Sequence, residues 1–481
     1  MKVLRCLMAA VMVVIASSSM AIAATLGDLE GQLKTIQGEI ERLKQDKQAQ
    51  DQRVRELEAA QKEQAVKGAQ SQQEQARRRE EQERKTVILS EEMEALKSKF
   101  TLPETVEYKS LYGLGPAASK VYHLPKGLSI GGYGEGSAIF YTGDNEGSSK
   151  KRNVGDLARF VTYIGYKFSD RIIMNTEIEY EHATTSSTVS SSGGSVSVEF
   201  SYLDFLLTEQ ANIRAGLLLM PMGFLTEIHE PPFYFGNLRP EVERRIIPST
   251  WRELGAGLHG TILPGLTYRT YVTNSLNAKG FSTSDVRGAR QSGNRALFEN
   301  VAWTGRLDYT PMPGLQLGGS IFYGHTGQNQ EFAGKKVDAP FTLFEFHSQY
   351  EYRGLRLRAL FAQGHIGDAD VLSAAAATGG KGPISSQILG GYAEVGYDIL
   401  PLLFPGTEMS LSPFFRFERL DTQANVPTGF TPDKSQDVTV INTGLSFKPI
   451  PNVVIKLDYR NLEAEKGKIA DEFNVGLGFN F

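Results

Sequence analysis

The sequence predicts an all-β transmembrane barrel of about 16 antiparallel strands, preceded by an α-helical coiled coil. Three observations predict it. Every aromatic residue and every proline lies at position 100 or later, so the first 99 residues form a separate region. Apolar residues repeat every three or four positions in that first region and every two positions beyond residue 127. Short turns alternate with long polar loops throughout the second region.

Residues 1–23 have the pattern of a secretory signal peptide. Lys2 and Arg5 give a basic start, an apolar run follows from Leu7 to Ile15, and Ala21-Ile22-Ala23 is a small-residue cleavage pattern. The chain's one cysteine, Cys6, lies within this segment. The mature protein therefore has no thiol, which excludes disulfides, thiolate metal sites and cysteine nucleophiles.

Residues 24–99 predict a periplasmic coiled coil. The apolar positions alternate spacings of three and four, which is a heptad seam, at Leu26, Leu29, Leu33, Ile36, Ile40, Leu43, Val54 and Leu57. A polar helix with one apolar stripe buries that stripe against copies of itself, so we expect self-association. The alternative is a single solvated helix. Residues 100–127 are expected to be a linker, and residues 128–481 the barrel.

Alternating apolar and polar residues between turn signals predict the strands. They are expected at 128–140, 156–168, 171–182, 195–207, 211–220, 251–263, 266–274, 298–310, 315–326, 340–352, 355–365, 386–398, 408–419, 437–448, 452–463 and 470–481. In 452–463 the odd-numbered Val453, Ile455, Leu457 and Tyr459 alternate with charged residues. A large apolar face opposite a charged face suits lipid outside and water inside. The first and last strands are expected to pair and close the barrel.

Several motifs resemble a known family. They are RAG at 214–216, PMGF at 221–224, HEPP at 229–232, RRIIPSTWRELG at 244–255, and a final strand with Phe473, Phe479 and the terminal Phe481 on one face. Together with the signal, coiled coil and strand number, the chain resembles the phosphate-selective porin O/P superfamily, within it the DcaP-type outer-membrane porins. That resemblance implies a homotrimer whose third long loop folds into the lumen, with a preference for anionic solutes such as phosphate or dicarboxylates.

Catalytic machinery is not indicated. The chain has seven histidines and no HExxH motif, and a catalytic site needs a nucleophile or a metal with converging ligands. His229 and Glu230 are adjacent, but in an extended backbone before two prolines their side chains point apart. We therefore expect no enzyme activity, no catalytic residues, no metal and no cofactor. The net charge of −4 gives no reason to expect nucleic acid as a partner.

Charged residues on the inward faces of the strands are the candidates for the pore lining. Arg214, Arg356 and Arg358 are basic wall positions, and Glu177 and Glu179 belong to an acidic ladder with Glu181. Opposed stripes of charge set up a transverse field that filters solutes by charge. The plainer alternative is that these charges only solvate the wall and pair with one another.

The loop 221–250 is the long loop rich in both aromatic residues and arginines. We expect it to fold into the barrel, where Arg239, Arg244 and Arg245 would join Arg214, Arg356 and Arg358 as an arginine-rich side of the constriction. The loop also carries Glu227, Glu230, Glu241 and Glu243, which could pair those arginines. The alternative is an extracellular lid or a contact between subunits.

The sequence thus favours an outer-membrane porin, a water-filled diffusion channel for small anionic hydrophilic solutes. Its expected partners are further copies of itself as a homotrimer, outer-membrane lipid and the solutes. Its expected place is the outer membrane of a bacterial cell, with the coiled coil in the periplasm. The alternative is a structural or adaptor barrel that links envelope layers or sheathes a partner such as an electron-transfer protein.

Overall fold

The computed structural model describes residues 81–82, 84–85, 110–145, 150–186 and 193–481. The predicted signal peptide, 1–23, lies outside the described residues. So does the predicted coiled coil, 24–99, apart from residues 81, 82, 84 and 85, which are helical. Within the described residues, no helix is both long enough and apolar enough to cross a membrane.

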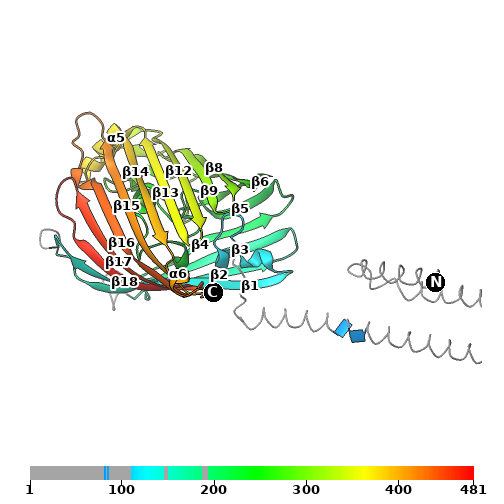
Figure 1. The fold of residues 1–481 in the computed structure, drawn as a ribbon. Coiled ribbons are helices and arrows are strands. Elements are labelled where there is room, and N and C mark those ends of the chain that lie inside the picture. The colour runs from blue at the N-terminus through cyan, green and yellow to red at the C-terminus, as the bar shows by residue number, and fades with distance from the viewer. Residues whose placement is uncertain (1–80, 83, 86–109, 146–149, 187–192) are drawn as a thin grey trace, which may run out of the picture. The chain divides into compact units, whose positions relative to one another are not determined.

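Sixteen antiparallel strands form a closed barrel in which each strand pairs with its neighbours in the sequence (Figure 1). They are β1 (Gly127–Thr142), β2 (Val154–Lys167), β3 (Ile172–Glu181), β4 (Val196–Phe205), β5 (Asn212–Leu219), β6 (Arg252–Leu263), β7 (Leu266–Asn274), β8 (Val301–Met312), β9 (Leu315–His325), β12 (Pro340–Tyr352), β13 (Leu355–Ile366), β14 (Gln387–Tyr397), β15 (Ser410–Asn425), β16 (Asp437–Ile450), β17 (Val453–Ala464) and β18 (Asp471–Asn480). The predicted strand number is confirmed.

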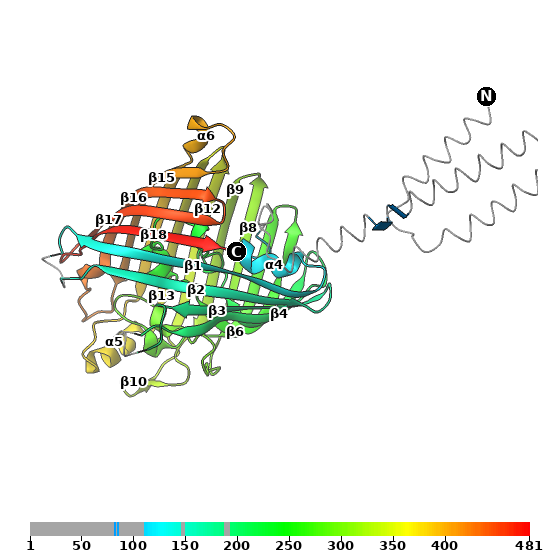
Figure 2. The same ribbon diagram turned by 90° about the horizontal axis from the view of Figure 1, so that it is seen from below.

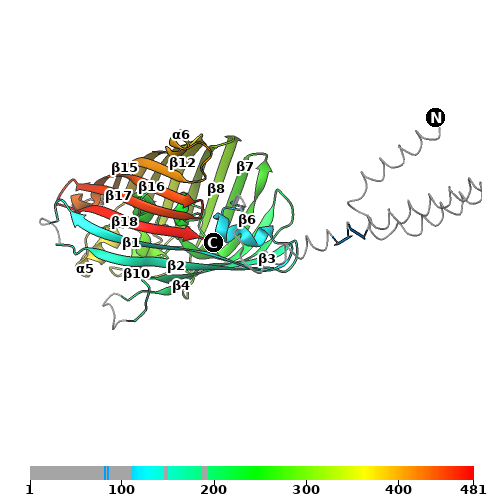
Figure 3. The same ribbon diagram turned by 60° about the horizontal axis from the view of Figure 1, so that its bottom comes forward.

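The barrel closes between its first and last strands, as predicted. Tyr133 of β1 lies opposite Asn480 of β18, and the pairing runs on to Thr142 opposite Asp471. Figures 2 and 3 show these two strands side by side. The ring of Phe479 on β18 lies where a Cβ on Gly134 would stand, and the ring of Phe481, which follows β18, lies where a Cβ on Gly132 would stand. Glycines on β1 therefore make room for the closing strand.

The predicted division of the two faces is also confirmed. On β17, Ile455, Leu457 and Tyr459 are 43%, 38% and 39% exposed on the outside, whereas the neighbouring Lys456, Asp458 and Arg460 are buried inside. The same alternation places Val301, Trp303 and Leu307 of β8 outside. Side chains of successive residues point to opposite faces of a strand, so a two-residue pattern becomes an apolar outer surface and a charged interior.

The two ends of the barrel differ in their connections. Short turns such as Pro264-Gly265 and Arg353-Gly354 join strands at one end, and Gly265, with a φ of 81°, supplies a left-handed position that the tight turn needs. Helix α6 (Leu400–Leu403) also lies between two strands at this end. The longer connections at the opposite end hold α5 (Ala369–Thr378), the hairpin β10 (Glu331–Phe332) to β11 (Lys335–Lys336), and the short helices η3 (Ala278–Gly280), η4 (Arg287–Ala289) and η5 (Lys434–Gln436).

The segment before β1 enters the barrel. Helix α4 (Pro116–His123) packs against β1, β2 and β3, close to where the chain ends in Figure 2. Gly165 of β2 leaves space for Val121 of the helix, and Tyr122 donates a hydrogen bond of 2.5 Å to Asp204. Part of the range predicted as a linker is therefore ordered helix, because its small apolar residues Ala117 and Ala118 are buried against the inner wall.

Candidate functional site

The connection between β5 and β6, residues 220–251, lies within the barrel and crosses its interior. It contains the 3₁₀ turn η1 (Pro231–Phe233) and the π-helical turn η2 (Val242–Ile246). Met220, Met222, Val242, Ile246 and Trp251 are fully buried. We call residues 220–251 the constriction loop. Its apolar residues explain why it packs inside, since exposed loops rarely bury several large apolar side chains.

Polar contacts fix the first half of the constriction loop to the wall. The Glu230 carboxylate accepts hydrogen bonds from the backbone N–H of Ala117 at 3.0 Å and from Asn480 Nδ2 at 2.6 Å. Burial raises the pKa of Glu230 to about 7. Tyr234 donates to Glu135 of β1 at 2.5 Å. These contacts hold the loop against α4, β1 and β18.

The second half of the loop is held by strands about a quarter of the way around the barrel from β18. The backbone N–H of Val242 donates to Glu418 of β15 at 2.7 Å. Glu243 accepts a hydrogen bond from Tyr392 of β14 at 2.7 Å, and its other oxygen accepts the backbone N–H groups of Phe224 and Leu225. Glu243 therefore closes the loop on itself as well as on the wall.

Inward-facing glycines provide the space that the loop occupies. A Cβ on Gly478 of β18 would lie 2.3 Å from Pro231 Cβ, and one on Gly396 of β14 would lie 2.4 Å from the Phe235 ring. A third, on Gly476, would lie 2.1 Å from Asn237 Oδ1. Any side chain at these positions would collide with the loop, so the wall and the loop fit only as a pair.

Most of the predicted wall arginines are neutralised. Arg214 forms a two-pronged pair with Asp204, with Nε and Nη2 each 2.8 Å from a carboxylate oxygen, and is covered by the α4 segment. Arg356 pairs with Glu351 at 2.6 Å. Arg358 donates to Gln349 and to the Phe233 carbonyl, and its guanidinium lies 4.6 Å from the centre of the Phe224 ring.

The arginines predicted on the constriction loop also lie apart from one another and bind different partners. Arg245 donates to the Ser284 carbonyl and to Gln436, which ties the constriction loop to two other long loops. Arg244 pairs with Glu241 at 2.5 Å. Of the six predicted arginines, Arg239 and Arg244 line the same cavity, and Arg356 lines a different one. The arginines thus lie at separate places in the barrel, and local acids, amides or carbonyls bind each of them except Arg239.

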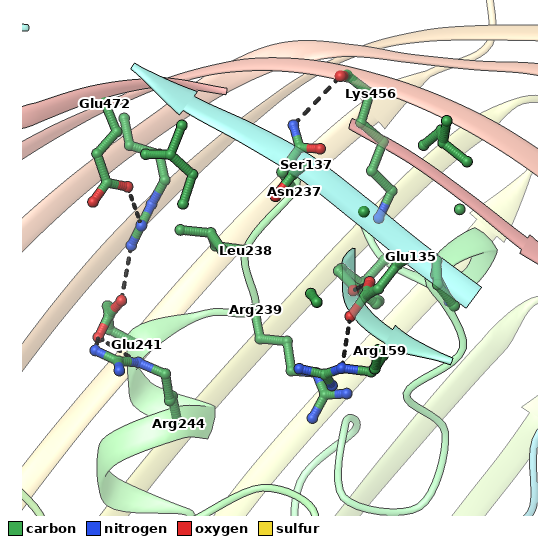
Figure 4. Close-up of a pocket in the computed structure, with 18 of the residues that line it drawn as sticks. Glu135, Ser137, Arg159, Asn237, Leu238, Arg239, Glu241, Arg244, Lys456 and Glu472 are labelled. Atoms are coloured by element: carbon green, nitrogen blue, oxygen red, sulfur yellow. Dashed lines mark hydrogen bonds and ion pairs between the residues drawn. The ribbon is translucent and has the colours of Figure 1, made fainter. Parts of the chain in front are cut away.

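That cavity has a volume of about 330 Å³ and lies between the constriction loop and strands β1, β2, β17 and β18 (Figure 4). Seven basic side chains line it, namely Lys151, Arg159, Arg239, Arg244, Arg287, Lys456 and Arg460. Three acidic side chains also line the cavity, namely Glu135, Glu241 and Glu472. Its lining therefore carries an excess of four positive formal charges.

Of the arginines that line this cavity, Arg239 keeps the most hydrogen-bonding capacity, although Nε of Arg159 and Nε of Arg460 also lack a partner among the described residues. Figure 4 shows its side chain beside that of Arg159, which pairs with Glu135 at 3.1 Å. Among the described residues, Nε and Nη2 of Arg239 have no hydrogen-bond partner. Burial, with the nearby guanidinium groups of Arg290 and Arg239, lowers the pKa of Arg287 to about 9, which reflects the crowding of positive charge here.

The predicted acidic residues lie close to this cavity, since Glu179 Oε1 is 3.6 Å from Nε of Arg159, which lines it. Glu177 and Glu179 of β3 are buried at 0% and 4% exposure, with His229 Nε2 3.1 Å from Glu177 Oε1. Glu199 of β4 joins them, so that Glu177, Glu199 and His229 are a group, among the described residues, with metal-ligand spacing. The sequence reasoning did not single out Glu199, Arg287 or Arg290. The basic residues of the loop 275–297 were the available signal for the two arginines.

No family model matches the chain. Among solved structures, OmpF of Salmonella typhi in complex with daunomycin covers 74% of this chain and 98% of its own at 13% identity, with a TM-score of 0.50. The outer-membrane channel DcaP of Acinetobacter baumannii covers 74% and 97% at 12% identity, with a TM-score of 0.46. With its closed 16-stranded sheet, the barrel has a porin-type fold.

The comparison of sequences shows kinship and not only a shared fold. An uncharacterized protein of Aquifex aeolicus (strain VF5) is 36% identical over 397 residues, which cover 80% of this chain and 87% of the relative. Identity at this level over most of both chains shows common descent. The chain therefore belongs to the same protein family as the Aquifex aeolicus protein.

Proposed function

We propose that this barrel is an outer-membrane porin, a diffusion channel for small anionic hydrophilic solutes. The observation that carries the proposal is the cavity beside the constriction loop, with seven basic and three acidic side chains in its lining. An excess of positive charge at the narrow part of a water-filled path raises the local concentration of anions and repels cations.

Arg239 is the residue that meets the solute in this proposal. A guanidinium group presents a planar fork that matches carboxylate and phosphate oxygens, and it stays charged at every relevant pH. Arg159 and Arg244 beside it are already paired with Glu135 and Glu241. One guanidinium without an acidic partner, among neighbours that have one, gives shallow binding, which a channel needs so that solute can leave.

The outer surface supports a place in a membrane. Large apolar side chains stand exposed around the barrel, among them Trp303 at 45%, Phe346 at 64%, Phe417 at 45% and Leu477 at 54%. A continuous apolar surface of this kind is unfavourable in water and favourable in lipid. The bacterial outer membrane is the membrane that holds such barrels, with the short turns on the periplasmic side.

The proposed assembly is a homotrimer with the segment 24–99 as a periplasmic coiled coil. The heptad spacing supports self-association, and the number three comes from the family resemblance of the sequence.

The alternative, a structural barrel that sheathes a folded partner, fits the interior less well. The constriction loop contacts β18 through Glu230 and, across the barrel, β8 through the Gly223 carbonyl, which accepts a hydrogen bond from Arg306. It therefore divides the space that a partner would occupy. Purified full-length protein in a planar lipid bilayer distinguishes the two. We expect steady conductance steps. Repeated silence from protein whose barrel is folded would favour the structural role.

A further inference from the structure

Three ligand-type side chains meet where the constriction loop touches strands β3 and β4. Glu177 comes from β3, Glu199 from β4 and His229 from the loop, and all three are at most 1% exposed. His229 Nε2 lies 3.1 Å from Glu177 Oε1 and 3.5 Å from Glu199 Oε2. Tetrahedral ligands about 2.0–2.2 Å from a zinc ion are themselves roughly 3.3–3.6 Å apart. The spacing is therefore that of a metal site.

A β-bulge brings Glu199 into this group. Glu177 lies opposite Phe200, but the next residue, Ile178, lies opposite Val198, so Glu199 is the extra residue of β4. Glu199 and Phe200 are consequently both buried, although regular alternation would have placed Glu199 on the outside. Bulges commonly re-aim a side chain next to a functional site. This one places a second carboxylate beside Glu177.

The His229 imidazole is oriented so that Nε2 can act as a ligand atom toward the two carboxylates. In the tautomer that carries its proton on Nδ1, a neutral His229 donates to the Thr226 carbonyl oxygen, which lies 3.3 Å from Nδ1. Nε2 then presents a lone pair to two carboxylates that also present lone pairs. A backbone carbonyl that fixes the tautomer through the far nitrogen is the usual support of a metal-bound histidine.

The available donors do not satisfy the two carboxylates. Arg252 donates to Glu199 Oε1 at 2.8 Å, but among the described residues Glu199 Oε2 and Glu177 Oε2 have no hydrogen-bond partner. Tyr133, whose ring packs edge-on against His229, is fully buried and its hydroxyl also has no partner. Buried polar atoms are nearly always satisfied, so this concentration of unsatisfied ones points to a cation.

We propose that Glu177, Glu199 and His229 bind one divalent first-row transition-metal cation, of the class of Zn²⁺ or Mn²⁺. One imidazole nitrogen with two carboxylate oxygens suits these ions better than Ca²⁺, which takes oxygen ligands only. The ion would join the constriction loop to the barrel wall across β3 and β4. It is a structural site, and it does not require the proposed channel function.

The test is metal binding to the full-length protein in detergent. Protein treated with a chelator, then equilibrated with Zn²⁺ and desalted, is expected to hold one tightly bound zinc ion per chain. Glu177→Gln, Glu199→Gln and His229→Gln should each weaken binding by roughly tenfold or more, by analogy with the 10- to 100-fold losses seen when a supporting residue of a metal site is removed. Co²⁺ in place of Zn²⁺ should give visible absorption bands that His229→Gln abolishes.

The matched control is His347→Gln. His347 is another buried imidazole of the interior, with Nδ1 2.8 Å from Glu345 and Nε2 2.8 Å from Asp308, and it should leave zinc binding unchanged. The change in gel mobility on heating reports that each barrel is folded. The proposal is overturned if folded wild-type protein retains no more zinc than a variant that combines Glu177→Gln, Glu199→Gln and His229→Gln, or if His347→Gln loses as much zinc as His229→Gln. If the variants do not fold, the zinc content and Co²⁺ spectrum of the wild-type protein decide alone.

Discussion

Replacing Arg239 with alanine tests the selectivity mechanism at one residue. The cavity lining carries seven basic and three acidic side chains, so the variant lowers the formal excess of positive charge from four to three. It also removes the guanidinium whose Nε and Nη2 have no partner within the described residues. The variant therefore breaks no ion pair of the wall, and we expect it to change the permeation of solutes and not the folding of the barrel.

The expected magnitude follows from Coulomb's law. A unit charge and a monovalent anion 4 Å apart attract by about 1 kcal/mol in bulk water and by about 4 kcal/mol at an effective dielectric of 20. A cavity open to water lies toward the lower value, and about 1 kcal/mol corresponds to roughly a fivefold change in relative permeability. We expect Arg239→Ala to lower the anion-to-cation permeability ratio by roughly that factor.

The assay is the reversal potential of single channels in a planar bilayer under a KCl gradient. The assay includes two control variants. Arg239→Lys keeps the charge and should keep most of the ratio. Arg419→Ala removes an arginine that is 65% exposed and paired with Asp437, outside the cavity lining, and should leave the ratio unchanged. A ratio for Arg239→Ala equal to that of the wild type would refute the assignment of this cavity to the permeation path.

Three further predictions follow from the interior. Gly478→Ala should lower the free energy of unfolding by about 1–3 kcal/mol, because its new methyl group would be overpacked against Pro231. Gly155→Ala is the control, since no atom lies within 4 Å of the added Cβ, and it should change the free energy of unfolding by less than about 0.5 kcal/mol. Equal effects of the two substitutions in thermal melts would refute the close fit between wall and loop. Burial raises the pKa of Glu230 to about 7, so its contribution to stability is full below its ordinary pKa of 4.5 and is lost as the pH rises through 7. The melting temperature of the wild type should therefore fall relative to that of Glu230→Gln across this window, and a constant difference would contradict it. Deleting residues 24–99 should reduce cross-linked trimers, and full retention of trimers would show that this segment is dispensable for assembly.

Much of the barrel could be predicted because its pattern is local. Each strand repeats its apolar positions every two residues, and a strand in this environment has only two faces to choose between. Val301, Trp303 and Leu307 therefore lie outside as expected. The ends of the strands were harder to predict than their faces, because a strand can continue through polar residues. β15 continues to Asn425, beyond the predicted end at 419, through a polar stretch that pairs with β14.

The site was less predictable because it depends on contacts between distant residues. Glu199 turns inward only because of the bulge on β4, which alternation along one strand does not show. Arg214 and Arg356 have the residue type of a selectivity filter, but Asp204 and Glu351 lie close enough to pair with them. Arg287, nearly fifty residues from Arg239 in the sequence, lines the same cavity. Residue types indicated an electropositive interior, and only the register and the loop contacts decide which charge is left without a partner.

The ion selectivity of the wild-type protein tests the central claim most directly. Full-length protein is inserted in a planar bilayer with a tenfold difference in KCl concentration, and the zero-current potential is read from single channels. The positive excess at the constriction predicts the sign of a channel in which Cl⁻ passes more readily than K⁺. A zero-current potential of the opposite sign, with K⁺ passing more readily than Cl⁻, would contradict the account.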